Sequence, residues 1–100
     1  RIALVSARMI SSFRCRQTES LFNGKRVPVF ANIESVAMRK LAMLHRAARL
    51  DDLRIPPINR LEQLKPDRAG QYSIRINDQW RLCFRFDGGN AFDVEIVDYH

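Results

Sequence analysis

The segment Asp98-Tyr99-His100 places a carboxylate, a phenol and an imidazole in succession. It follows a stretch with the apolar–polar alternation of a β-strand, and a strand end fixes side chains better than a loose tail does. Histidine is the side chain best suited to proton transfer near neutral pH. The triplet is therefore a candidate acid–base group, although a terminal sequence of this kind is more often only the end of a chain.

RNA cleavage is the reaction that needs the fewest groups beyond such a triplet. RNA carries its own nucleophile, the 2′-hydroxyl, so the protein has to align it with the phosphate, transfer protons and stabilise phosphoryl charge. Lys65 and Arg81 could stabilise that charge, while Asp98, Tyr99 or His100 could transfer protons. The chain has no glycine-rich phosphate loop, nucleophile elbow or metal-ligand spacing, so we expect neither a nucleotide cofactor nor a metal ion.

The charge of the chain favours an anionic partner. Lys and Arg number 17 against 11 Asp and Glu, a formal net charge of +6, and nucleic acid is the first candidate for such a basic domain. Residues 1–86 carry +10, whereas residues 87–100 carry −4. Two interpretations of the acidic end stay open. Asp93 and Glu95 pair with arginines across a sheet, which is the commoner outcome, or this end of the chain carries acid–base chemistry.

Length and composition predict one small globular domain. The chain is 46% hydrophobic, which is too apolar for a disordered tail, and 100 residues bury a single two-layer core. A new pattern starts at Met9, so we expect the domain to span 9–100, with 1–8 an upstream extension or a cloning remnant. Cys15 and Cys83 form neither a disulfide framework nor a zinc site by themselves, and we expect them in or near the core.

Targeting signals are not apparent in the sequence. No apolar run approaches the roughly 20 residues that a membrane helix needs, and residues 1–8 are too short and too interrupted for a signal peptide. We therefore expect a protein of the reducing cytoplasm without a membrane partner.

Two helices are expected in the first half of the chain. After a short strand at 10–15, Thr18 can cap a helix that Asn23-Gly24 ends. The clearer helix has Asn32 as its cap and a single apolar face at helical spacing, formed by Ile33, Ala37, Leu41, Leu44 and Ala48. Pro56-Pro57 prevents its continuation. His45 on this helix has no partner at metal-ligand spacing, so we expect it at the surface or at the boundary of the core.

A three-stranded antiparallel meander is predicted after a polar connection at 58–69. Tight turns at 77–79 and at Asp87-Gly-Gly-Asn90 separate the strands. One face carries the apolar set and should pack on the long helix: Tyr72, Ile74, Ile76, Trp80, Leu82, Phe84, Phe86, Phe92, Val94 and Ile96. The opposite face carries the basic and amide residues that could hold RNA phosphates, namely Arg75, Asn77, Arg81 and Arg85. The expected fold class is α+β, with two helices on a small antiparallel sheet.

Several segments together resemble the HigB toxins of the RelE/ParE toxin–antitoxin superfamily. They run in the expected order over residues 9–100 and comprise Met9-Ile-Ser-Ser-Phe13, Asn59-Arg-Leu-Glu-Gln-Leu-Lys65, Asp67-Arg68, Gly70-Gln-Tyr-Ser-Ile-Arg-Ile-Asn-Asp-Gln-Trp-Arg81 and Val94-Glu-Ile-Val-Asp-Tyr-His100. The resemblance implies a β-α-α-β-β-β order, with the first strand completing the sheet. It also implies a ribosome-dependent mRNA endonuclease that acts in the decoding site. Its expected partner is a HigA-type helix-turn-helix antitoxin, and operator DNA is bound only through the toxin–antitoxin complex.

The same resemblance assigns roles to individual positions. Lys65 and Arg81 match basic positions of the family's active site, and Asp98, Tyr99 and His100 match its catalytic C-terminal end. Glu62 stands where certain members have a histidine, so the general base is Glu62, or His100 acts alone, or cleavage is weak. The residues expected to hold RNA are Arg68, Arg75, Asn77, Gln79 and Arg85, of which Gln79 falls where some relatives have an asparagine.

Two other functions fit the same fold and charge. A toxin of the ParE type blocks DNA gyrase without cleaving RNA and does not need the terminal triplet. A plain basic module binds RNA or the ribosome without turnover, with an affinity that falls steeply as salt rises.

Overall fold

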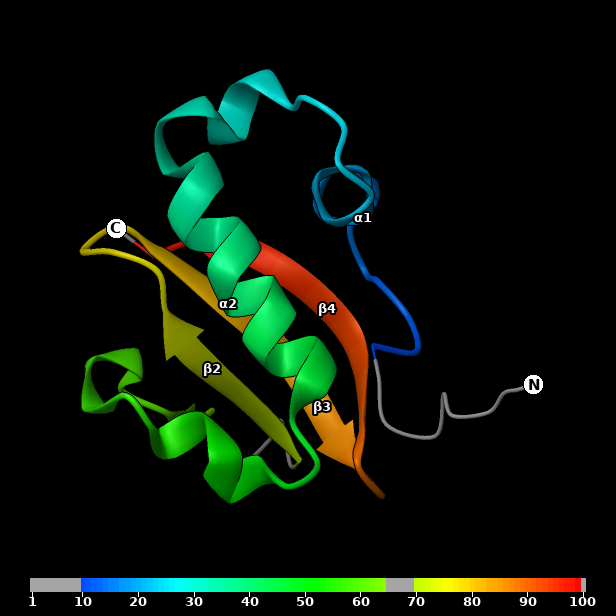
Figure 1. Cartoon of the computed structure of the whole chain (residues 1–100), viewed down its shortest axis with the longest axis vertical. Coiled ribbons are helices and arrows are strands. Elements are labelled where there is room, and N and C mark those ends of the chain that lie inside the picture. Colours follow the sequence, from blue (N-terminus) through cyan, green and yellow to red (C-terminus); the bar gives the residue numbers. More distant parts are fainter. Residues whose placement is uncertain (1–9, 65–69, 100) are drawn as a thin grey trace.

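The computed structural model describes residues 10–64 and 70–99 and has an α+β fold. Two α-helices, α1 (Arg16–Phe22) and α2 (Glu34–Arg46), precede an antiparallel sheet of order β1-β2-β3-β4. Its strands are β1 (Glu62–Gln63), β2 (Gln71–Arg75), β3 (Trp80–Asp87) and β4 (Asn90–Asp98). Figure 1 shows α2 crossing one face of the sheet, with α1 beside β4. The predicted fold class is confirmed.

Three 3-10 helices connect these elements: η2 (Pro28–Ile33), η3 (Leu50–Arg54) and η4 (Pro57–Asn59). The polar connection predicted at 58–69 was wrong in part, because it contains the end of η4 and the short strand β1. β1 pairs with β2 through Glu62–Ser73 and Gln63–Tyr72. Two residues without an apolar alternation give too little pattern to identify a strand from sequence. β1 nevertheless matters, because it brings Glu62 onto the sheet.

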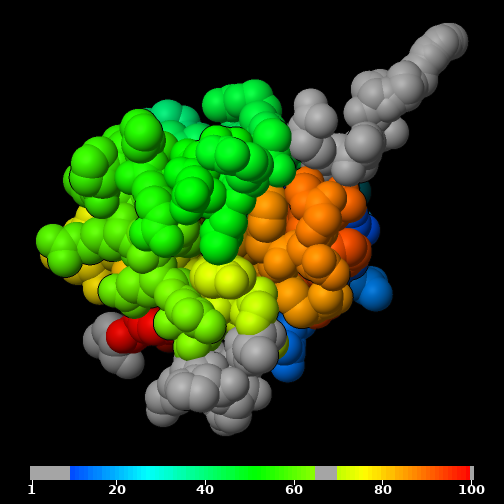
Figure 2. Space-filling view, turned by 90° about the horizontal axis from the view of Figure 1, so that it is seen from below, coloured from blue at the N-terminus to red at the C-terminus, as the bar shows by residue number. Residues whose placement is uncertain are grey.

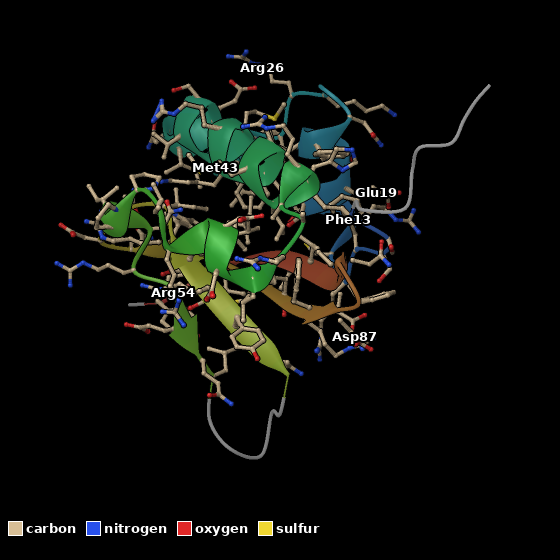
Figure 3. The ribbon with its side chains drawn as sticks, turned by 60° about the horizontal axis from the view of Figure 1, so that its bottom comes forward. Phe13, Glu19, Arg26, Met43, Arg54 and Asp87 are labelled. Carbon is tan, nitrogen blue, oxygen red and sulfur yellow. The ribbon has the colours of Figure 1, made fainter. Side chains whose placement is uncertain are left out.

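The segment before α1 runs along the free edge of β4. The strand expected at 10–15 is present as two isolated parallel bridges, Ile10–Ala91 and Phe13–Val94. The amide of Ser11 donates to the carbonyl of Ala91 at 2.7 Å, and the amide of Val94 donates to the carbonyl of Ser12 at 3.1 Å. In Figure 3 this segment, marked by Phe13, lies on the same side of the molecule as the hairpin at Asp87.

The strands of the meander follow the predicted alternation of faces except at one bulge in β4. Both glycines of the Asp87–Asn90 hairpin have positive φ, +60° and +83°, as its tight turn requires. Between the pairs Cys83–Glu95 and Arg85–Phe92, β4 contains one residue more than β3, and Asp93 has a left-handed φ of +54°. The bulge reverses the alternation. Phe92 was predicted to lie in the core, and this was wrong: it lies on the same face as Arg85. Ala91 is buried instead.

The core lies between α2 and the sheet. Ile33, Ala37, Leu41 and Leu44 are buried as expected, against sheet residues such as Ile74, Leu82, Phe84 and Val94. Ala48 is exposed and Ala47 buried, because α2 ends at Arg46 and the chain turns extended at Ala47. The helix thus stops well before Pro56. Cys83 is buried and Cys15 is half-buried.

Neither predicted helix cap acts as one. The N-cap of α1 is Cys15, and that of α2 is Ile33, since η2 runs directly into α2 through Asn32. Thr18 is fully buried, and its Oγ1 accepts a hydrogen bond from the amide of Ile96 at 3.0 Å. Its hydroxyl therefore ties α1 to β4.

Replacement of Thr18 by valine should lower the free energy of unfolding by about 1–3 kcal/mol. The variant keeps the side-chain shape but leaves the buried Ile96 amide without an acceptor. Thermal denaturation should show a drop of several degrees. Thr18→Ser is the control, because it keeps the hydroxyl and loses only a methyl group; a larger loss for serine than for valine would contradict this role of the hydrogen bond.

Candidate active site

Arg81 lies on the sheet face opposite α2, and its guanidinium is held by backbone and side-chain acceptors. Its Nε donates to Ser73 Oγ at 2.8 Å, and its Nη2 donates to the carbonyl of Arg60 at 2.6 Å. The side chain is only 11% exposed. Ser73 is on the neighbouring strand β2, and Arg60 follows η4, so two separate elements fix the position of this cation.

Glu62 and Tyr99 both lie near this guanidinium. Glu62 Oε1 is 3.8 Å from Arg81 Nη2, and the centre of the Tyr99 ring is 6.0 Å from Arg81 Cζ. β1 supplies Glu62, and the residue after β4 is Tyr99. In Figure 2 the end of β4 (red) lies against the green segment that contains residues 60–64. The fold thus brings together a carboxylate, a guanidinium and a phenol that are far apart in the sequence.

Asp98 and Tyr99, at the end of β4 and just after it, are held by the turn between β2 and β3. Asn77 Oδ1 accepts hydrogen bonds from the amides of Gln79 and Trp80, both at 2.8 Å. Gln79 in turn donates through Nε2 to Asp98 Oδ2 at 3.0 Å, and its carbonyl accepts from the Tyr99 amide at 2.6 Å. Asn77 and Gln79, both predicted to hold RNA, therefore have positioning contacts inside the protein.

Among the remaining predicted site residues that the structure describes, Arg75 is the cross-strand neighbour of Arg81, whereas Arg85 lies farther along β3. Arg75 pairs with Asp78. Arg85 is 3.6 Å from Asp93 and its Cζ lies 4.7 Å from the centre of the Phe92 ring. It is four residues from Arg81 along β3, or about 13 Å. Three further candidates, Lys65, Arg68 and His100, lie outside the described residues.

The acidic strand residues pair with arginines, which was the commoner of the two interpretations. Asp93 faces Arg85, and Glu95 Oε2 is 3.8 Å from Arg14 Nε. His45 is at the boundary of the core, where its Nδ1 accepts from the amide of Ile10 at 3.3 Å and its ring contacts Phe22. Within 10–64 and 70–99, no three His, Cys, Asp or Glu side chains gather as metal ligands would. No helix in those ranges is long and apolar enough to cross a membrane.

The arrangement around Arg81 can stabilise negative charge and transfer protons. A guanidinium held by fixed acceptors needs little reorganisation when charge develops on a phosphoryl oxygen. Glu62 and Tyr99 offer a carboxylate and a phenol beside it. Two of the residues that hold Arg81 were missed from the sequence, Ser73 and Arg60. Ser73 alternates with Tyr72 and Ile74 in the sequence, and pairing β2 with β3 would have indicated it as a neighbour of Arg81.

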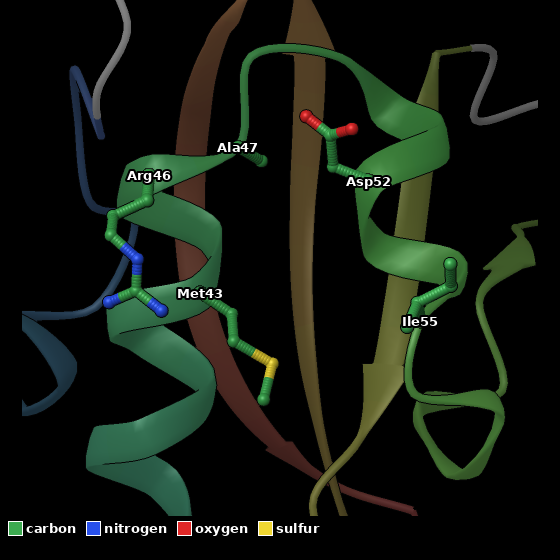
Figure 4. A pocket seen from close by; sticks show the side chains of 5 residues that line it. All are labelled: Met43, Arg46, Ala47, Asp52 and Ile55. Atoms are coloured by element: carbon green, nitrogen blue, oxygen red, sulfur yellow. The ribbon is translucent and has the colours of Figure 1, made fainter.

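A separate hollow of about 310 Å³ lies between the end of α2 and η3 (Figure 4). Met43, Arg46, Ala47, Asp52 and Ile55 line it. Asp52 is already used in the fold, because its Oδ2 accepts from the amides of Ala48 and Arg49, both at 3.0 Å. The hollow therefore offers no free carboxylate for chemistry.

Lys40 on α2 is a buried cation that was not predicted from the sequence. It is 6% exposed, and its Nζ donates to Asn59 Oδ1 at 2.5 Å. Burial lowers the pKa of Lys40, and the nearby charges of Arg39 and Arg75 lower it further. Its spacing could have indicated it, since Lys40 is seven residues after Ile33 and three after Ala37, on the apolar face.

The stability of the protein should rise relative to a Lys40→Met variant as the pH increases through the alkaline range. A lysine with a lowered pKa in the folded state disfavours folding below that pKa, and the penalty disappears as the pH approaches 10.5, the ordinary value of lysine. Methionine does not titrate, so the stability of the variant has no such contribution from this position. Urea unfolding of both proteins at a series of pH values, in buffers without phosphate, measures the difference; parallel stability curves would contradict the prediction.

Comparison with known proteins gives a consistent result. A family model described as the RelE-like toxin HigB of type II toxin–antitoxin systems matches residues 11–100. The chain is 32% identical to Endoribonuclease HigB of Proteus vulgaris over 93 residues, which are 92% of this chain and 100% of that protein. It is 44% identical to Toxin HigB-1 of Vibrio cholerae over 64 residues, which cover 64% of this chain and 67% of that protein. An uncharacterized protein of Haemophilus influenzae is 42% identical over 61 residues, 60% of its own length.

Proposed function

This chain belongs to the family of RelE-like HigB toxins of type II toxin–antitoxin systems, and from this premise we propose that it inhibits translation by cleaving mRNA on the ribosome. A toxin of such a system has an antitoxin as its partner. We further propose that this antitoxin is a HigA-type helix-turn-helix protein and that operator DNA is bound only through the complex. The Proteus vulgaris relative, which the chain covers completely, is named an endoribonuclease, and that name supports the enzymatic function.

The observation that carries this proposal is the fixed Arg81 guanidinium, with Glu62 and Tyr99 beside it. A cation held at the protein surface for simple phosphate binding needs no such neighbours. Cleavage of RNA needs a stabilised phosphoryl charge together with groups that accept and donate protons. Tyr99 lies near this guanidinium, and Asp98 and His100 are its neighbours in the sequence, which supports the proposal.

In the proposed reaction the 2′-hydroxyl of the substrate is the nucleophile, and no metal ion takes part. The 2′-oxygen attacks phosphorus, its proton passes to a base, and the bond from phosphorus to the 5′-oxygen breaks. The products are a 2′,3′-cyclic phosphate and a 5′-hydroxyl, which receives a proton. Arg81 and Lys65 stabilise the phosphoryl oxygens. Glu62, whose Oε1 is 3.8 Å from Arg81 Nη2, is the carboxylate available as the base, and His100 is the principal group for proton transfer.

Cleavage of mRNA on translating ribosomes tests this function. The intact chain should cleave mRNA, and a chain ending at Tyr99 should cleave it about 10²–10⁴-fold more slowly, the range of a lost general acid or base. Equal rates would remove His100 from the mechanism. The absence of cleavage by either chain would reject the enzymatic function.

The same preparations separate the two other functions. A toxin of the ParE type is identified by two measurements together: it inhibits DNA supercoiling by gyrase, and it leaves mRNA uncleaved. A binding module without turnover shows affinity for RNA but no cleaved product. The proposed site of action is the cytoplasm, where ribosomes and mRNA are found. The family match over residues 11–100 supports a single toxin domain over 9–100.

A further inference from the structure

A second hollow, of about 230 Å³, lies at the edge of the sheet between α2, η4 and the end of β2. Three of its lining side chains are basic and three are apolar: Arg39, Lys40, Arg75, Val36, Ile58 and Ile76. No acidic side chain lines it among the described residues. The hollow is distinct from the one shown in Figure 4 and shares no residue with it.

The positive charge of this pocket is only partly balanced. Asp78 pairs with Arg75, but the Asp78 side chain is 99% exposed and is not part of the lining. Over residues 10–64 and 70–99, neither Arg39 nor Lys40 forms an ion pair. Lys40 donates to a neutral amide oxygen of Asn59 instead. A buried ammonium beside two guanidinium groups is unfavourable unless an anion joins them.

The pocket adjoins the candidate active site through β2. Arg75 pairs directly with Arg81 across β2 and β3, a pairing that puts their Cα atoms about 4.5–5.5 Å apart. β1 pairs only with Ser73 and Tyr72, so it leaves Arg75 at an uncovered end of β2. On the other side, Ile58 is two residues before Arg60, whose carbonyl holds Arg81. Strand β2 and the segment 58–60 therefore each contribute to both sites.

We propose that Arg39, Lys40 and Arg75 bind a phosphate group of the RNA next to the phosphate that is cleaved. The proposal rests on the proposed function. Two guanidinium groups and an ammonium provide the charge-assisted donors that suit phosphate oxygens. The continuity with Arg81 places this second anion along the same RNA chain. It favours RNA over an acidic peptide, since nothing would require a peptide to lie beside the cleaved phosphate.

Nuclear magnetic resonance titration tests the pocket without requiring catalysis. Inorganic phosphate, and separately a short 2′-O-methylated RNA that cannot be cleaved, are added to the complete chain. We expect saturable shifts at Lys40 and Arg75 and competition between the two ligands. Arg39→Gln should weaken RNA binding about tenfold, the effect of one lost charge-assisted hydrogen bond. It should also reduce the salt dependence of binding by about 0.7 in the logarithmic slope.

The matched control is Arg46→Gln. Arg46 is also an exposed arginine on α2, two turns beyond Arg39, and it does not line the pocket. It should leave RNA affinity within twofold of the unchanged chain. Equal weakening by both variants would overturn the proposal in favour of diffuse attraction. Absence of saturable shifts would also overturn it, as would an Arg39→Gln chain that binds RNA normally but binds its antitoxin weakly.

Failure of this proposal is distinguishable from failure of the proposed function. If the pocket binds both ligands and the chain cleaves no mRNA on ribosomes, the pocket stands and the enzymatic function falls. If mRNA is cleaved while phosphate and RNA produce no shift in the pocket, only the pocket falls.

Discussion

Replacement of Arg81 by glutamine should slow mRNA cleavage on ribosomes by about 10²–10³-fold, the loss seen when one preorganised donor to a developing charge is removed. Glutamine can keep the contact with Ser73 but carries no charge. The loss should therefore appear in the rate at saturating ribosomes more than in affinity. Single-turnover cleavage over a range of ribosome concentrations measures both quantities.

Two further variants make the Arg81 result specific. Arg81→Lys keeps the charge but loses the planar fork that reaches Ser73 and Arg60 together, so its rate should lie between those of the glutamine variant and the unchanged chain. Arg14→Gln breaks another pair at 3.8 Å, with Glu95, which makes none of the Arg81 contacts described above, and should leave the rate unchanged. Thermal unfolding of each variant is the control: an unchanged unfolding temperature shows that a slower rate does not come from a loss of structure. Cleavage by Arg81→Gln within threefold of normal would remove Arg81 from the catalytic residues.

Replacement of Asn59 by alanine should reduce the free energy of unfolding by about 3–5 kcal/mol. Asn59 is completely buried, and its two polar atoms serve different partners. Its Oδ1 accepts from Lys40 Nζ, and its Nδ2 donates to the carbonyl of Leu53 at 3.1 Å. Alanine leaves an ammonium and a carbonyl without partners, and each such group costs about 1–3 kcal/mol, with more for a charge. Urea unfolding measures the loss.

A double-mutant cycle isolates the contribution of the buried ammonium. In a Lys40→Met background, Asn59→Ala should cost less, because no charge is left without an acceptor. Asn32→Ala is the matched surface control, since Asn32 is exposed, and it should change stability by less than about 0.5 kcal/mol. Equal costs of Asn59→Ala in both backgrounds would mean that Asn59 does not stabilise Lys40.

The parts of the fold that were predictable from sequence have strong local patterns. The apolar face of α2 from Ile33 to Leu44 repeats at helical spacing, and the Asp87–Asn90 turn has two glycines with the positive φ that it needs. The bulge at Asp93 could not be predicted, because a left-handed aspartate is chosen by its neighbours in the sheet. Phe92 was consequently assigned to the wrong face. The roles of Thr18 and Asn32 were wrong for a related reason: α1 begins earlier than Thr18, and η2 replaces the expected start of α2.

The candidate site was predictable only as a set of residue types. Glu62, Arg81 and Tyr99 are all candidates by residue type and resemblance, and the structure places them together. The support for Arg81 depends on Ser73 and on the carbonyl of Arg60, and a backbone carbonyl leaves no trace in residue identity. Lys40 was missed because a lysine on an apolar face is normally expected to extend its ammonium to water. Only the position of η4 reveals that Asn59 holds it in place.

Residues 10–15, before α1, affect whether the edge of β4 can pair with a strand of another molecule. Strand β4 would otherwise present open backbone donors. The amide of Val94 is used by Ser12, that of Asp93 by the Ser12 hydroxyl, and that of Ile96 by Thr18. At the opposite margin, β1 is two residues long and polar. Fibril growth and strand exchange begin on long, unsatisfied margins. Residues 10–15 thus occupy an edge that could otherwise add a strand from another molecule, and we expect a chain trimmed back to α1 to aggregate more readily.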